Sequence, residues 1–162
     1  LLLIKRYFFD MIYLNNLKQV KNLKEIVIKI KTVQYDNATK MSDVIELTTE
    51  AKYFKKNSSH YLIYEESELS GLEDTTTKIK MTGSKVELKR IGKHDSEMVF
   101  EKDRRFESLM TTPMGNIPLE ILTNRISFSQ QDEPFNLDLE VEYSISLKGL
   151  FQGKNVMKIE VI

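Results

Sequence analysis

The sequence predicts an all-β protein in which an antiparallel meander closes into a barrel. Three features predict this fold. Apolar and polar residues alternate with a period of two from residue 25 onward, as in strands with one buried and one exposed face. Turns of about two to six residues separate about nine or ten such stretches. None of these turns is long enough to hold the helix that joins parallel strands, so we expect antiparallel pairing.

Residues 137–148 show the alternation most clearly. Every odd position, from Leu137 to Leu147, is apolar or aromatic, and every even position is polar. A helix would distribute these apolar residues around its axis. The segment is also longer than a typical strand, and long antiparallel strands are typical of barrels and strongly coiled sheets.

The same pattern predicts the other strands. In chain order they are expected at residues 26–33, 44–49 with a continuation at 52–55, 60–66, 75–81, 86–91, 97–101, 106–112, 117–121, 126–128 and 156–162. Turns are predicted between them. All six glycines are assigned to turns, where positive φ is tolerated: Gly71, Gly83, Gly92, Gly115, Gly149 and Gly153.

The alternation changes parity once within a strand. Apolar residues between positions 117 and 121 occupy odd positions, whereas Ile126 and Phe128 occupy even positions. An extra residue in one strand of an antiparallel pair produces such a change. We therefore predict a β-bulge or a bend near Thr123 and Asn124.

The composition fits one globular domain. The chain has 162 residues, of which 41% are hydrophobic and 30% are charged, and this length supports a single core. Residues 25–162 contain no repeat, low-complexity segment or linker, so they are assigned to one domain. A meander of this length is expected to close because closure removes exposed strand edges.

Residues 1–24 are predicted to be a leader that is disordered or forms a short helix. The opening apolar run is four residues long and is followed by charged residues, so it resembles neither a secretory signal nor a membrane span. We therefore expect a cytoplasmic protein with no membrane partner. A short amphipathic helix is suggested by apolar residues at a spacing of three: Leu14, Leu17, Val20 and Leu23.

Charge and cysteine content exclude several classes of function. The chain has 24 Lys and Arg residues and 24 Asp and Glu residues, so its formal net charge is zero. A generally basic nucleic-acid-binding protein is therefore not expected. There is no cysteine, which excludes disulfides, thiolate metal sites and thiol nucleophiles.

Five segments together resemble the YwiB-like family of bacterial proteins. They are LIYEE at residues 62–66, GLEDTTTKIK at 71–80, VELKRIG at 86–92, MVFE at 98–101 and TPMG at 112–115. The resemblance extends over about residues 25–162. It implies a lipocalin-like (calycin-type) β-barrel of unknown function, with a small-ligand or partner role by analogy. It transfers no catalytic residue, and a fold does not imply a function.

A set of side chains on one face of consecutive strands is the candidate ligand-binding site. In one choice of register, hydroxyls and one cation lie among Met and aromatic residues, an arrangement that can hold a small apolar or amphipathic ligand. Such a site needs an interior cavity of roughly 300 Å³ or more. The alternative is that these residues only fill the core. The set is Thr75, Thr77, Arg90, Met98, Phe100, Thr112 and Tyr143.

The acidic pair Glu65 and Glu66 lies beside this set. Adjacent strand residues point to opposite faces, so the two carboxylates need not converge for acid–base chemistry. One of them is expected to be solvated, whereas the other could point into the barrel. A buried carboxylate would need a partner such as Arg90.

No catalytic, metal or cofactor motif is recognisable. His60 and His94 are the only histidines, and neither has a neighbour at metal-ligand spacing. No phosphate-binding glycine loop or nucleophile elbow is present. We therefore expect a protein that is not an enzyme and has no cofactor; an enzyme acting at the barrel mouth is the least favoured hypothesis.

Basic stripes define the main alternative function. With Phe54, Tyr61 and Tyr64 they could form a stacking surface for single-stranded RNA, or a surface for a protein, on a barrel whose interior is fully packed. Acidic residues at Glu46, Glu87 and Glu101 instead favour ordinary cross-strand ion pairs. The stripes comprise Lys29, Lys31, Lys78, Lys80, Lys89 and Arg90.

Overall fold

Ten strands and one short 3₁₀ helix make up the computed structural model, which describes residue 20 and residues 22–162. The predicted all-β class and antiparallel pairing are confirmed. The leader and its possible helix lie outside the described residues, except for residues 20 and 22–24. The elements are β1 (Lys24–Asp36), β2 (Ser42–Lys56), β3 (Ser59–Glu65), η1 (Glu68–Ser70), β4 (Thr75–Thr82), β5 (Lys85–Gly92), β6 (Ser96–Glu101), β7 (Arg105–Thr112), β8 (Gly115–Asp132), β9 (Phe135–Leu147) and β10 (Phe151–Val161).

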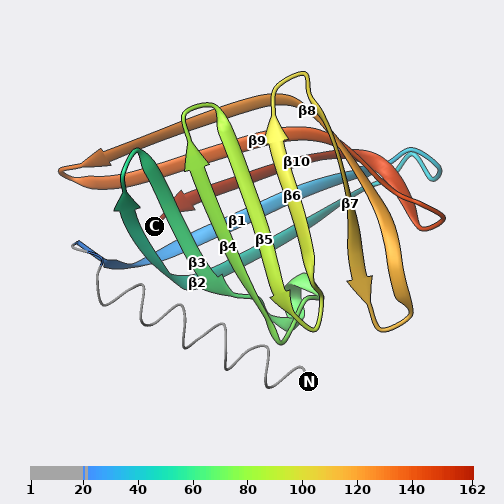
Figure 1. The fold of residues 1–162 in the computed structure, drawn as a ribbon, viewed down its shortest axis with the longest axis horizontal. Helices are drawn as coiled ribbons and strands as arrows, with labels where there is room; N and C mark the ends of the chain where they lie inside the picture. Colours follow the sequence, from blue (N-terminus) through green and yellow to red (C-terminus); the bar gives the residue numbers. More distant parts are fainter. Residues whose placement is uncertain (1–19, 21) are drawn as a thin grey trace.

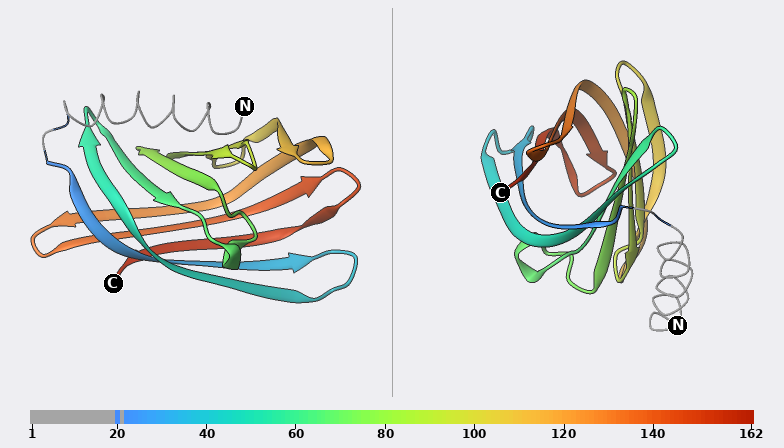
Figure 2. Two further views of the ribbon diagram at one scale, coloured as in Figure 1. Left: turned by 90° about the horizontal axis from the view of Figure 1, so that it is seen from below. Right: turned by 90° about the vertical axis from the view of Figure 1, so that its left-hand side faces the viewer.

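All ten strands belong to one sheet, in the order β6-β5-β4-β3-β2-β1-β10-β9-β8-β7. The long strands β8, β9, β10, β1 and β2 run across the back of the molecule, and β3 to β6 cross them in front (Figure 1). Viewed from the end, the strands curl around a common interior (Figure 2). The first and last strands pair directly, from Ile28 with Val161 to Asp36 with Gly153.

The barrel is nearly closed, and its seam lies between β6 and β7 rather than at the chain ends. In place of a full ladder, the Thr111 backbone N–H donates to the Asp95 carbonyl at 2.8 Å and the Asp103 N–H donates to the Thr123 carbonyl at 3.1 Å. Lys102 and Thr123 also form an isolated parallel bridge. These contacts leave the seam less strongly paired than the other strand junctions.

A second irregularity separates β2 from β3. These two strands pair only from Lys52 with Ile63 to Lys56 with Ser59, so the amino-terminal half of β2 diverges from β3. The segment between β3 and β4 contains η1, which packs against β2. Ser67 caps η1, and Gly71 ends it in the left-handed conformation at φ 70°, which glycine adopts without steric cost. This segment and the divergence of β2 shape one end of the interior.

Alternating residues of the strands form the core. Ile28, Leu62, Ile79, Phe100 and Leu139 are completely buried, as expected for inward-facing positions. The predicted parity change is confirmed, because Thr123 pairs with Tyr143 and Arg125 pairs with Glu142, which leaves Asn124 as an extra residue in β8. The bulge lets the apolar residues on both sides of it face inward.

The assignment of Gly153 to a turn is wrong. Gly153 lies inside β10, opposite Asp36 of β1. A Cβ atom at this position would lie 1.9 Å from the Tyr35 carbonyl oxygen, so glycine is required by the close approach of two backbones. In the described part of the chain, no helix is both long and apolar enough to cross a membrane.

Candidate functional site

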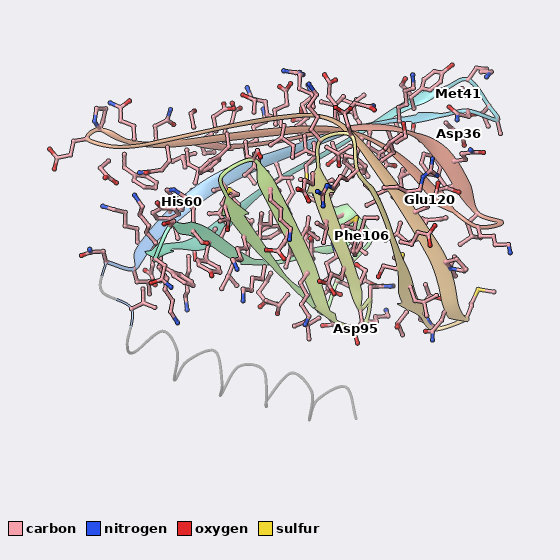
Figure 3. The ribbon with its side chains drawn as sticks, turned by 45° about the horizontal axis from the view of Figure 1, so that its top comes forward. Asp36, Met41, His60, Asp95, Phe106 and Glu120 are labelled. Atoms are coloured by element: carbon pink, nitrogen blue, oxygen red, sulfur yellow. The ribbon has the colours of Figure 1, made fainter. Side chains whose placement is uncertain are left out.

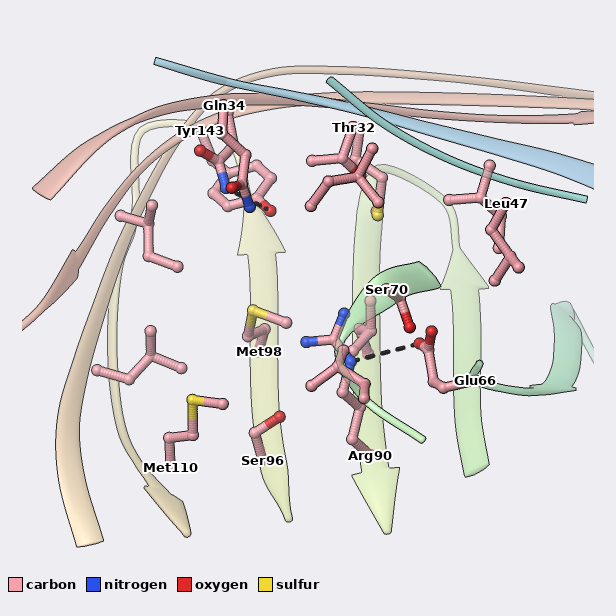
Figure 4. Close-up of a pocket in the computed structure, with 18 of the residues that line it drawn as sticks. Thr32, Gln34, Leu47, Glu66, Ser70, Arg90, Ser96, Met98, Met110 and Tyr143 are labelled. Carbon is pink, nitrogen blue, oxygen red and sulfur yellow. Dashed lines mark hydrogen bonds and ion pairs between the residues drawn. The ribbon is translucent and has the colours of Figure 1, made fainter. Parts of the chain in front are cut away.

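A cavity of about 230 Å³ lies inside the barrel, lined by residues of β1 to β3, of β5 to β10 and of the β3–β4 segment. It is smaller than the roughly 300 Å³ that the ligand-binding hypothesis requires, so that prediction of its size is not met. Its walls are mainly apolar, and its polar groups gather in two places (Figure 4). The apolar lining is Ile30, Ile45, Leu47, Leu72, Leu88, Met98, Met110, Leu119, Ile145, Leu147 and Met157; the polar lining is Thr32, Gln34, Tyr64, Glu66, Ser70, Arg90, Ser96, Tyr143 and Asn155.

The first polar place is an ion pair between Glu66 and Arg90. Arg90 Nε lies 3.6 Å from Glu66 Oε1, and the Glu66 side chain is only 3% exposed. The Thr77 hydroxyl donates to the same Glu66 oxygen at 2.6 Å. Arg90 is the partner predicted for a buried glutamate at this position, and this pairing is confirmed. Glu65 faces the other way and accepts from the Thr76 hydroxyl at 2.7 Å.

Tyr64 belongs to the same polar cluster. Its hydroxyl shares hydrogen bonds with Thr77 and Glu66. Burial, and then the negative charge of Glu66, raise the pKa of the Tyr64 phenol far above its ordinary value of 10.0. Desolvation disfavours the phenolate, so Tyr64 is neutral at physiological pH. The carboxylate of Glu66 is therefore stabilised by two hydroxyls as well as by the guanidinium of Arg90.

The second polar place is formed by Tyr143 and Asn155. The Asn155 side-chain amide nitrogen donates to the Tyr143 hydroxyl at 3.3 Å, and the two residues are cross-strand partners on β9 and β10. Burial raises the pKa of the Tyr143 phenol. Figure 4 shows Tyr143 beside Gln34, separated from the pair of Arg90 and Glu66.

Three buried polar atoms of residues that line the cavity have no hydrogen-bond partner among the described residues. They are Arg90 Nε, Ser96 Oγ and Asn155 Oδ1. A fourth such atom, Thr123 Oγ1, does not belong to a lining residue. Buried polar atoms are normally paired, and leaving them unpaired costs stability. Three of the four such atoms therefore belong to residues around one cavity.

The structure places the sequence-predicted site residues in three environments. Arg90, Met98 and Tyr143 line the cavity. Thr77 lies behind it and holds Glu66, whereas Phe100 is fully buried and packs against the Tyr143 ring at 4.7 Å.

The other two predicted residues do not line the cavity. Thr75 is buried on the inward face of β4, and its hydroxyl donates to the Glu73 carbonyl at 3.4 Å. Thr112 ends β7, where its hydroxyl donates to the Gly115 carbonyl at 2.9 Å. These contacts explain both threonines as structural parts of the strand and the turn.

Sequence reasoning missed Ser96 and Asn155. Ser96 shares its parity with Met98 and Phe100, so the alternation of β6 could have placed it on the inward face. Asn155 shares its parity with Met157 and Ile159, but the last strand was predicted to begin at residue 156, whereas β10 begins at Phe151. A predicted last strand that began before residue 155 would have placed Asn155 on the inward face.

The opposite end of the interior is filled by aromatic rings. Tyr53 packs against Phe135 at 5.0 Å, and His60 packs edge-on against Phe128 at 5.0 Å. The Tyr53 hydroxyl and His60 Nδ1 form a hydrogen bond of 2.8 Å. Figure 3 shows His60 at the end of the barrel away from Asp36 and Met41.

The lysines of the basic stripes lie on the outer face, where three of them pair with acids, whereas Arg90 lies inside the barrel and pairs with Glu66. Lys29 and Lys31 both contact Glu46, at 3.7 and 3.5 Å, and Lys80 contacts Glu87 at 3.8 Å. The predicted cross-strand ion pairs are therefore confirmed.

A smaller aromatic feature adjoins these ion pairs. The Tyr61 ring stacks on Phe54 at 4.7 Å, and Lys78 Nζ lies 5.4 Å from the centre of the Tyr61 ring. Phe54 is buried, so only Tyr61 of this stack presents a ring to a partner.

Comparison with known proteins identifies the family. The crystal structure of the ywiB protein from Bacillus subtilis matches with a TM-score of 0.76 and 20% sequence identity, covering 91% of this chain and 98% of that chain. No curated protein matches. A family described as a domain of unknown function (DUF1934) matches residues 28–159. The resemblance to the YwiB-like barrel proteins is thus confirmed, and the chain belongs to the DUF1934 family.

Proposed function

We propose that this protein binds a small amphipathic molecule inside its barrel, in the cytoplasm, and does not transform it chemically. One observation carries the proposal. Three buried polar atoms without hydrogen-bond partners among the described residues, Arg90 Nε, Ser96 Oγ and Asn155 Oδ1, belong to residues that line one mainly apolar cavity. A ligand that supplies their hydrogen bonds removes the cost of leaving them unpaired.

The size of the cavity limits the ligand. At about 230 Å³, the space lies below the range of pockets that enclose drug-sized molecules. The thioethers of Met98, Met110 and Met157 contribute flexible walls that adapt to ligand shape. The proposed ligand is therefore a small molecule rather than a long lipid.

The alternative is a module that binds nucleic acid or protein through its outer face. The Tyr61 ring with Lys78 and Lys80 around it favours this function, because base stacking and cation–π contacts are sequence-tolerant ways to hold single strands. The alternative expects a packed interior, however, and the cavity weighs against it. The pairing of Lys80 with Glu87 also reduces the positive charge of this surface.

Native mass spectrometry of the protein purified from cells tests the proposal. We expect a bound small molecule on the wild-type protein. Ser96→Leu should lose it, because leucine fills the cavity and Ser96 Oγ gives up no hydrogen bond to the described residues. The matched control is Ser127→Leu on the exposed face of β8, which should keep the ligand.

Two results would contradict the proposal. A wild-type protein that carries no small molecule would overturn interior binding, and co-purified nucleic acid in its place would support the outer-face alternative. Retention of the same molecule by Ser96→Leu would show that binding occurs elsewhere on the protein.

A further inference from the structure

The residues around the cavity include one ion pair, with hydrogen-bond donors at the Arg90 end and an acceptor at Asn155. From these we propose that the ligand is uncharged, with a hydrogen-bond acceptor toward Arg90 and Ser96 and a donor toward Asn155. This inference rests on the proposed function, since it specifies the chemical class of the molecule that the same cavity binds.

The charges lining the cavity cancel. Its ionisable lining residues are Glu66, Arg90, Tyr64 and Tyr143. Glu66 and Arg90 form an ion pair, and both phenols are held neutral by burial. A charged ligand would therefore bring an uncompensated charge into a space with mainly apolar walls, where desolvation is costly. An uncharged polar head avoids that cost.

Hydrogen-bonding capacity sets the orientation. The guanidinium of Arg90 can only donate, and the oxygen of the Asn155 amide can only accept. Arg90 Nε is ion-paired with Glu66 but has no hydrogen-bond partner among the residues described, and Asn155 Oδ1 has none either. Ser96 pairs with Arg90 across β5 and β6, so its hydroxyl lies at the Arg90 end and can donate to the same acceptor. A ligand with one acceptor end and one donor end is complementary to this arrangement.

The space between the two polar places is apolar. Leu88 and Met98 are cross-strand partners beside Arg90 and Ser96, and Met157 neighbours Asn155 at the same parity on β10. Figure 4 shows Met98 between Ser96 and Tyr143. The ligand is therefore expected to have a short hydrocarbon segment between its two polar ends.

Three matched probes test the charge of the ligand. They are ω-hydroxyhexanamide, ω-hydroxyhexanoate and ω-hydroxyhexylammonium, which differ at one end only. Titrations are followed by NMR of the methionine methyl groups. Met98, Met110 and Met157 line the cavity, whereas Met41 and Met114 are 67% and 97% exposed and serve as internal controls.

We expect the amide to shift the cavity methyl signals and to bind about tenfold or more tightly than either charged probe. Glu66→Gln removes the negative member of the ion pair, so it should reverse the preference in favour of the carboxylate probe. Glu65→Gln is the matched control, because the neighbouring Glu65 faces away from the interior and accepts from Thr76. It should keep the wild-type preference.

The outcomes separate this inference from the proposed function. If the wild-type protein binds the carboxylate or the ammonium probe as tightly as the amide, with shifts at the cavity methyls, interior binding holds and the uncharged class is wrong. If none of the probes shifts the cavity methyls, both proposals are overturned. The wild-type comparison stands even if Glu66→Gln fails to fold.

Discussion

Tyr53 and Tyr143 lie toward opposite ends of the barrel interior, and each places a buried phenol beside one other polar side chain. The Tyr53 hydroxyl is bonded to His60, and aromatic rings fill the space around it. The Tyr143 hydroxyl is bonded to Asn155, but Asn155 Oδ1 has no partner among the described residues and a cavity adjoins it.

This difference distinguishes an end filled by aromatic rings from an end that contains a cavity. At the aromatic end, the rings pack against one another and the Tyr53 hydroxyl is bonded to His60, so the contacts stabilise the barrel. At the cavity end, the residues around an unfilled space include the ion pair of Glu66 and Arg90. Three buried atoms of these residues, one of them Arg90 Nε, have no hydrogen-bond partner among the described residues. Buried polar atoms that lack hydrogen bonds cost stability, so this end is less well satisfied than the aromatic end.

The largest expected effect is that of Phe100→Ala. Phe100 is completely buried and packs against Tyr143, yet it does not line the cavity. Removal of a buried phenyl group should cost about 3–5 kcal/mol of unfolding free energy, measured by urea denaturation, while the bound small molecule is retained. Loss of the ligand from a folded Phe100→Ala protein would break the distinction between core and site.

A smaller loss is expected when the ion pair at the cavity end is broken. Glu66→Leu leaves the Arg90 charge without its partner, and Arg90 is only 18% exposed, so we expect a loss of about 2–3 kcal/mol. The double variant Glu66→Leu, Arg90→Met should recover most of this loss, because it removes both charges. Chemical denaturation of these two variants and of Arg90→Met completes a double-mutant cycle, which measures the interaction between Glu66 and Arg90. A double variant less stable than Glu66→Leu would show that the pair stabilises the fold directly.

The smallest effect concerns pH and the aromatic end. Burial, and then the positive charge of Lys55, lower the pKa of His60 below its ordinary value of 6.5, although Asp132 opposes this. The unfolded chain therefore binds the proton more readily than the folded protein. The stability contributed by neutral His60 is present above about pH 6.5 and is lost as pH falls through the lower folded-state pKa.

Unfolding free energies measured between about pH 8 and pH 5 test this effect. His60→Gln should flatten the decline that the wild-type protein shows below pH 6.5. His94→Gln, which removes the other histidine of the chain, should retain the wild-type slope. An unchanged slope in His60→Gln would assign the pH dependence to other groups and weaken the description of this end as a packed structural unit.

Most of the fold could be predicted from local patterns. The alternation at residues 137–148 identified the long strand β9, and the parity change before Ile126 identified the bulge at Asn124. These features depend on which face each side chain occupies, and a period of two fixes the face from neighbouring residues alone. Gly153 was assigned wrongly because its requirement comes from Tyr35 on another strand.

The candidate site was predicted only in part. The pairing of Glu66 with Arg90 followed from one rule, that a buried carboxylate needs a cation. Ser96 and Asn155 were missed because neither residue type signals burial, and their lack of partners is visible only when all surrounding strands are in place. The divergence of β2 from β3, which shapes this end, leaves no mark in the alternation of either strand.

The sequence by itself determined the class of fold, the inward face of nearly every strand and the position of the bulge, since each depends on residues close together in the chain. Only the tertiary structure decided that the seam lies between β6 and β7, that one end is filled and that the other surrounds a cavity. These properties depend on register and curvature across all ten strands. Small changes in the packing of side chains from different strands decide whether buried polar atoms form hydrogen bonds.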